Sequence, residues 1–188
     1  MIDVFPVLRV LGMLIMLFAL AMGVPLAVSW YAQDGVWQVY PAAMGVALLV
    51  GLGLLVGMRR YKRELQPRHG VMLVSLVWAL LPLFAAVPLM LACAQIGRPM
   101  SFTHAYFEAV SGLTTTGSTV LSNLDTLPVS VNVWRTFLQW IGGMGILILA
   151  VAVLPLLGVG GAQLFKAEAA GPIKDTKLTP RMTETAKG

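Results

Sequence analysis

Four long apolar runs constrain the fold of this chain more than any other feature. Each is longer than the roughly 20 residues that a helix needs to cross about 30 Å of hydrocarbon. The whole sequence is 58% hydrophobic and only 11% charged, well outside the composition of soluble domains. We therefore expect an all-α integral membrane protein whose four spanning helices lie at about 7–29, 37–58, 70–94 and 133–159.

The first two runs each need one further interpretation. A cleaved signal peptide is the alternative for the first run, because Asp3 and Arg9 lie at its start. The run exceeds the usual apolar core of about 7 to 15 residues, which favours a spanning helix. In the second run, Gly53 and Gly57 have a spacing that lets another helix approach closely, and we interpret them as packing positions.

Ten of the 13 Lys and Arg residues are concentrated in two places, the connection after the second run and the C-terminal tail. Short connections rich in Lys and Arg stay in the cytoplasm, so we expect both places, and with them both termini, to be cytoplasmic. Nucleic acid is not an expected partner, because Tyr61 is the only aromatic residue among these cations. The cations are Arg59, Arg60, Lys62, Arg63 and Arg68 in the connection, and Lys166, Lys174, Lys177, Arg181 and Lys187 in the tail.

Catalytic and metal-ligating patterns are absent from the sequence. Cys93 is the only cysteine, and the two histidines, His69 and His104, are far apart and lack neighbouring ligands. Glu108 and Asp125 lie near His104 in sequence, but their spacing matches no hydrolase or metal-ligand signature. We therefore expect no enzyme activity and no catalytic residue.

The segment 101–132 lies between the third and fourth runs and is too short and too polar for two further crossings. Its apolar part, 101–113, would reach only part-way through a membrane as a helix. The two basic regions lie on the same side of the membrane only if this segment enters and leaves the membrane from the opposite side. We therefore expect a re-entrant pore helix and loop, which is tolerated at membrane depth only where it is buried by protein or lines a watery cavity.

The loop after this short helix has the composition of a monovalent cation site. Backbone carbonyls replace the hydration shell of such an ion without strong fixed charge, and glycine lets the backbone turn its carbonyls toward the ion. The C-terminal end of the preceding helix adds a negative dipole. The sequence thus predicts a monovalent-cation filter formed by the carbonyls of Thr115, Thr116, Gly117 and Ser118, with the Thr115 hydroxyl as a possible further ligand. The alternative is a Thr-rich turn whose hydroxyls only satisfy its own backbone.

Two charged residues flank this loop. Glu108 belongs to the short helix, and we interpret it as structural support, with a local negative potential as the alternative. Arg135 opens the fourth run, and we interpret it as an interface anchor.

A family resemblance covers nearly the whole chain and is strongest from Phe107 to Gly145. It rests on 107–117 (FEAVSGLTTTG), 134–135 (WR), 139–145 (QWIGGMG) and 177–187 (KLTPRMTETAK). In these segments the chain resembles the Trk-type potassium uptake family. The resemblance implies a membrane subunit of the bacterial inner membrane, with a leading helix pair and four helix, pore-helix, helix repeats around one potassium path.

The resemblance also assigns roles to particular residues and implies partners. It makes Gly117 the filter glycine of the first repeat, the carbonyls of Thr115 and Thr116 potassium ligands, and Gly142 and Gly143 supporting residues. Potassium is the transported ion, and no other cofactor is expected. A cytoplasmic regulatory subunit that binds nucleotides is an implied partner, together with the lipid bilayer.

One repeat supplies only about a quarter of each carbonyl ring in a four-loop filter. We expect the helix pair and basic loop at 1–67, the first repeat at 68–160, and a cytoplasmic link toward a second repeat at 161–188. The expected function is potassium uptake, with this chain a truncated first portion. A homotetrameric cation channel of single-repeat subunits and a structural or assembly membrane protein are the alternatives.

Overall fold

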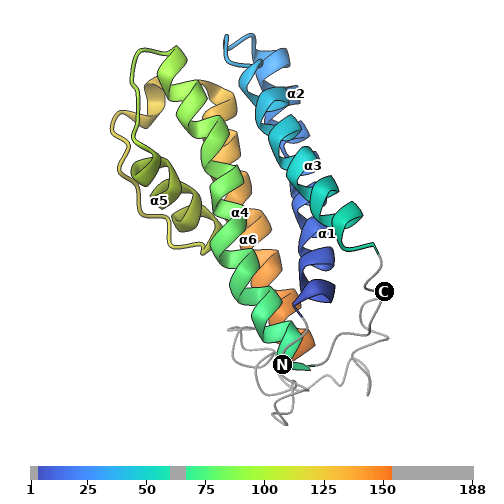
Figure 1. Ribbon diagram of the computed structural model, residues 1–188. Coiled ribbons are helices and arrows are strands. Elements are labelled where there is room, and N and C mark those ends of the chain that lie inside the picture. The colour runs from blue at the N-terminus through green and yellow to red at the C-terminus, as the bar shows by residue number, and fades with distance from the viewer. Residues whose placement is uncertain (1–3, 60–66, 154–188) are drawn as a thin grey trace, which may run out of the picture. The chain divides into compact units, whose positions relative to one another are not determined.

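The computed structural model describes residues 4–59 and 67–153, which are entirely helical apart from turns and loops (Figure 1). The residues up to Leu149 form one compact unit, and a second unit begins at Ala150. The expected link at 161–188 and most of the basic connection after the second run lie outside the described residues. The elements are α1 (Phe5–Ala21), α2 (Gly23–Ala32), α3 (Val39–Gly57), α4 (Pro67–Gln95), α5 (Phe102–Leu113), the 3-10 helix η1 (Leu124–Thr126) and α6 (Val129–Val153).

Three helical stretches in the described residues are long and apolar enough to cross a membrane: Phe5–Ala32, Val39–Gly57 and His69–Gln95. They confirm the first three predicted apolar helices, with ends shifted by a few residues. The first stretch comprises α1 and α2, which separate at Met22. Pro25 has no backbone N–H to donate to the carbonyl of Ala21, and its ring clashes with that carbonyl. Helix α6 starts before the predicted 133, and its predicted end at 159 lies outside the described residues.

The leading pair of helices packs through glycine. A Cβ atom at Gly12 would lie 2.8 Å from the carbonyl oxygen of Gly51, and one at Gly51 would lie 2.9 Å from that of Gly12. Any side chain at either position would therefore separate α1 from α3. At Gly53 and Gly57, by contrast, no described atom lies within 4 Å of an added Cβ, so the close approach occurs at a different glycine from the predicted pair.

Helix α4 holds the later helices through carbonyls near its two prolines. The hydroxyl of Tyr106 donates to the carbonyl of Ala79 at 3.0 Å, and Nε1 of Trp134 donates to that of Ala85 at 3.1 Å. Each accepting residue follows directly after the residue whose carbonyl loses its helical donor to Pro82 or Pro88. These two hydrogen bonds, of which only the one from Trp134 is buried, thus join α5 and α6 to α4.

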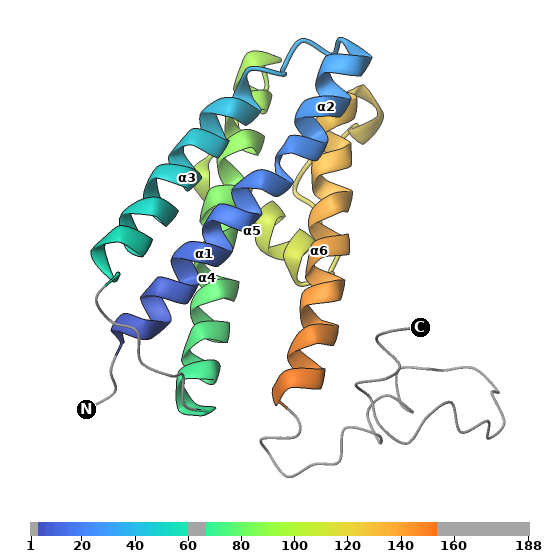
Figure 2. The ribbon, with the colours of Figure 1, turned by 90° about the vertical axis from the view of Figure 1, so that its right-hand side faces the viewer.

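The chain between α4 and α6 leaves and returns at one end of the unit (Figures 1 and 2). After α4 ends, α5 runs back alongside it, and an extended loop then returns to the start of α6. The two ends of this excursion are tied together, because Nη1 of Arg98 donates to Oγ1 of Thr126 at 2.9 Å. The loop that carries the predicted filter is therefore positioned at the far end of α5, about 18 Å along a helix of 12 residues.

Candidate functional site

Helix α5 has well-defined ends, which fix where the loop begins. Ser101 caps its start and accepts a hydrogen bond from the backbone N–H of His104 at 3.3 Å. At its other end the N–H of Thr115 donates a hydrogen bond to the carbonyl of Gly112 at 3.0 Å. The N–H of Thr116 donates one to the carbonyl of Ser111, also at 3.0 Å. This pair of bonds is a Schellman motif, which satisfies the last helical carbonyls and turns the chain sharply.

The turn requires unusual backbone angles. Thr115 has φ 57° and Gly117 has φ 74°. A glycine adopts such angles without steric cost, but a β-branched threonine does so at a cost of about 1 to 3 kcal/mol. Such strain is typical of functional sites, and its placement at Thr115 coincides with the residue predicted to bind potassium.

The loop after α5 exposes backbone oxygens that accept no hydrogen bond. Within the described residues, no donor reaches the carbonyls of 114–117. Ser118 differs, because its carbonyl accepts a bond from the hydroxyl of Ser111 at 2.7 Å. Residues 114–120 are all exposed. Three of the four predicted filter residues, Thr115, Thr116 and Gly117, therefore have unpaired carbonyls, and Ser118 has one lone pair already occupied.

Threonine hydroxyls in the loop serve the backbone and one another. The hydroxyl of Thr114 donates to the carbonyl of Val110 at 2.8 Å, and it lies 2.8 Å from the hydroxyl of Thr116. This part of the loop matches the alternative of a self-satisfying turn. The unpaired carbonyls that follow are not explained by that alternative.

Glu108 joins the helix, the returning loop and α6. Its Oε1 accepts hydrogen bonds from the hydroxyl of Thr119 at 2.5 Å and from the N–H of Val120 at 2.6 Å. Its Oε2 accepts a hydrogen bond from Nε of Arg135 at 3.0 Å. The Glu108 side chain is 2% exposed and that of Arg135 is 14% exposed. The interpretation of Arg135 as an interface anchor was therefore wrong. Sequence reasoning missed the ion pair, which joins residues 27 positions apart on different elements.

Glycines on α6 and α5 let these helices meet beside the loop. A Cβ at Gly142 would overlap the carbonyl group of Leu113, and a Cβ at Gly112 would lie 3.0 Å from Cβ of Leu138. At Gly143 the nearest atom to an added Cβ would be Cγ2 of Thr115, at 3.8 Å. Both predicted supporting glycines thus lie against the end of α5, and Gly142 is the one that allows the close approach.

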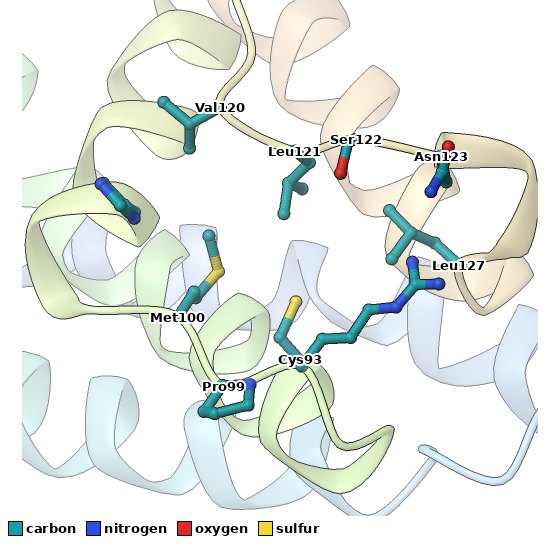
Figure 3. A pocket seen from close by; sticks show the side chains of 10 residues that line it. Cys93, Pro99, Met100, Val120, Leu121, Ser122, Asn123 and Leu127 are labelled. Atoms are coloured by element: carbon teal, nitrogen blue, oxygen red, sulfur yellow. The ribbon is translucent and has the colours of Figure 1, made fainter.

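A cleft of about 410 Å³ lies between the end of α4 and the returning loop (Figure 3). Figure 3 shows Cys93, Pro99 and Met100 on one side and Val120 to Asn123 on the other. Arg98 and His104 also line it. The Arg98 guanidinium makes this cleft unfavourable for a cation, and none of the four predicted filter residues lines it. No group of three or more potential metal-ligating side chains occurs in the described part of the chain.

Comparison with known families decides the family. Residues 38–187 match a family described as TrkH, cation transport protein. This chain belongs to the TrkH family. The match includes α3 to α6 and the loop with the unpaired carbonyls, which confirms the family resemblance drawn from the motifs.

Individual relatives agree with the family assignment. The Trk system potassium uptake protein TrkH of Halomonas elongata is 48% identical over 181 residues, which are 96% of this chain and 37% of that protein. The protein of the same name from Escherichia coli K12 is 44% identical over 179 residues, 95% of this chain and 36% of its own length. This chain therefore spans little more than a third of the length of these TrkH relatives.

A solved structure of the family has the same fold. The crystal structure of the potassium transporter TrkH from Vibrio parahaemolyticus superposes with a TM-score of 0.79 at 38% sequence identity. The alignment covers 99% of this chain and 36% of that one. The helical arrangement is therefore that of a TrkH protein, and the apolar helices indicate a multi-pass membrane protein.

Proposed function

We propose that this chain contributes one carbonyl-lined pore loop to potassium uptake. The observation that carries the proposal is the exposed run of unpaired carbonyls at Thr115, Thr116 and Gly117, directly after the C-terminal end of α5. The names of the TrkH relatives support potassium as the ion. In this proposal the chain is the first of four pore-loop repeats, as the family resemblance implies.

The proposed mechanism is an exchange of ligands around the ion. A potassium ion loses part of its hydration shell and is coordinated by backbone oxygens, with Ser118 contributing its remaining lone pair. The C-terminal end of α5 supplies a partial negative charge near the same point. Because these groups carry no full charge, the ion binds weakly enough to leave on the other side.

Glu108 supports the filter in this proposal without binding the ion. Its carboxylate is neutralised by Arg135 and occupied by donors from Thr119 and Val120. The returning loop is therefore fixed to α5, and a strong negative charge beside the ion path is avoided. A bare carboxylate there would hold a cation too tightly for rapid passage.

We further propose a topology for the chain. Helices α1–α2, α3, α4 and α6 span a bacterial inner membrane four times, and α5 with its loop enters and leaves from the outer face. Both termini and the basic connection after α3 are cytoplasmic, which the clustered Lys and Arg residues support. The proposed divisions are the helix pair at 1–67, one repeat at 68–160 and a cytoplasmic link at 161–188.

Partners follow from the same proposal. One loop cannot surround an ion, so three further loops, from other repeats or from identical subunits, are needed to close the filter. A cytoplasmic nucleotide-binding regulatory subunit is proposed from the family resemblance.

A substitution in the loop tests the proposed function. Gly117→Asp places a charged side chain at φ 74° beside the ion path, and we expect it to abolish potassium uptake. Gly97→Asp is the matched control, because Gly97 has φ 73°, open surroundings and a position outside the loop. Uptake is measured in cells that depend on the protein carrying this chain, with the amount of membrane-inserted protein determined for each variant. Normal uptake by a well-expressed Gly117→Asp variant would refute the proposal.

A further inference from the structure

The turn between α2 and α3 reaches across the unit to the start of α6. In this turn Gln33 has φ 53° and Gly35 has φ 83°, which places the side chain of Asp34 between the two elements. Oδ2 of Asp34 accepts the backbone N–H of Ser130 at 2.9 Å, although the two residues are 96 positions apart. Figure 2 shows the end of α2 beside the beginning of α6.

The same carboxylate is held in place by its own turn. Oδ1 of Asp34 accepts the hydroxyl of Ser29 and, at 3.3 Å, the N–H of Val36. Ser29 and Ser130 are completely buried, and Val36 is 2% exposed. Asp34 itself is half-buried, and hydrogen bonds to an ionised carboxylate are stronger than those between neutral groups.

Asp34 supplies the side-chain cap that the start of α6 lacks. The first N–H groups of a helix have no partner within it and are usually capped by a side-chain oxygen of the residue before the helix. Here that residue is Pro128, which has no side-chain oxygen. The cap for Ser130 therefore comes from the leading helix pair, and its negative charge also suits the positive end of the α6 dipole.

The charge on this cap persists at physiological pH. Burial raises the pKa of Asp34, but hydrogen bonds from Ser130, Ser29 and Val36 outweigh burial, so the pKa lies below the ordinary 3.8. The carboxylate is thus ionised over the range in which cells grow.

We propose that Asp34 is a positioning residue for the filter, acting through α6 on the ion pair that holds the loop. Arg135 follows Ser130 by five residues on the same helix, about 7.5 Å along its axis. A shift of α6 along its axis would move Arg135 relative to Glu108 and release the segment that begins at Thr119. This inference rests on the proposed potassium filter and adds a residue from outside the pore-loop repeat to it.

The test compares Asp34→Ala and Asp34→Asn with the control Asp125→Asn. Asp125 is an exposed carboxylate on η1, shortly before α6, and it is not part of the hydrogen-bonded group of Asp34, Ser29, Val36 and Ser130. The first measurement is hydrogen exchange in the peptide that covers the first turn of α6. The second is uptake kinetics, with the KM for potassium and the inhibition by sodium determined separately from the maximal rate.

We expect Asp34→Ala to speed exchange at the start of α6 and to raise the KM for potassium by roughly tenfold, the lower end of what one lost hydrogen bond to a charged group is worth. Inhibition by sodium should increase as well, because the filter loop is less well held. Asp34→Asn should keep the exchange rate, the KM and the sodium inhibition closer to those of the unsubstituted protein, since its amide oxygen still accepts a hydrogen bond from Ser130. The Asp125→Asn control should match the unsubstituted protein.

The possible failures are distinguishable. Unchanged exchange in Asp34→Ala would show that Asp34 does not cap α6 and would overturn the inference. Faster exchange with an unchanged KM and unchanged sodium inhibition would also overturn it, because the cap would then serve the fold alone. Failure of the filter proposal itself is recognised independently, by normal uptake in Gly117→Asp.

Discussion

Glu108 shows most directly how one residue organises the loop. Its two carboxylate oxygens accept from a side chain and a backbone N–H of the returning segment and from Arg135 on α6. The sequence predicts structural support at this position, and the fold shows that Glu108 forms an ion pair with Arg135. Thr115 is the second informative residue, because its strained φ of 57° is maintained by the Schellman bonds around it.

Replacing the carboxylate tests the ion pair. Glu108→Gln leaves Arg135 without a counter-charge at a site where its side chain is 14% exposed. Breaking a buried pair in this way costs about 3 to 5 kcal/mol, so we expect a marked loss of thermal stability in detergent. The exposed-site substitution Asp125→Asn should change stability by no more than about 0.5 kcal/mol. Equal melting behaviour of the two variants would contradict the role given to the pair.

At the scale of elements, glycine decides where helices approach closely. Gly12 and Gly51 bring α1 and α3 together, and Gly142 brings α6 against the end of α5. The sequence predicted supporting roles for Gly142 and Gly143, but it could not rank them. The space around each glycine distinguishes them. At Gly143 an added Cβ would lie 3.8 Å from its nearest neighbour, whereas at Gly142 it would overlap Leu113.

Alanine substitutions along α6 test this ranking. Gly142→Ala should push α6 away from the end of α5 and reduce potassium uptake at least about tenfold, because the overlapping atoms are backbone and cannot turn aside. Gly145→Ala is the matched control on the same helix, since no described atom lies within 4 Å of its added Cβ. The control should retain uptake. The ranking fails if both variants transport equally well at equal expression.

At the scale of the described molecule, the leading helix pair packs against α4 and also makes specific contacts with α6. Phe18 of α1 packs against Trp134 of α6 with ring centroids 5.6 Å apart, and Trp134 in turn donates to Ala85 of α4. With the Asp34 cap, these contacts connect the leading helix pair to the part that carries the loop. The leading pair is therefore placed to influence the loop as well as to anchor the chain.

Labelling of single cysteines tests the proposed topology. Cys93 is 1% exposed, so background labelling at the native cysteine should be low. A membrane-impermeant thiol reagent added outside intact cells should label Ser122→Cys, which is exposed on the returning loop. It should label Arg59→Cys, at the end of α3, only after the membrane is opened. Labelling of Ser122→Cys from the cytoplasmic side alone would rule out the re-entrant arrangement.

The sequence by itself determined the helices, the short helix with its loop, and the family. Apolar runs of this length form helices in lipid because every backbone group must be satisfied locally, so neighbouring elements are not needed to predict them. The filter residues were predicted from the loop composition and from the family resemblance, and their role remains a prediction. Only the tertiary structure decided which residues meet, as in the pairs Asp34 with Ser130, Glu108 with Arg135, and Gly142 with Leu113. Such pairs depend on how the helices pack, and no local pattern records which partners packing brings within bonding distance.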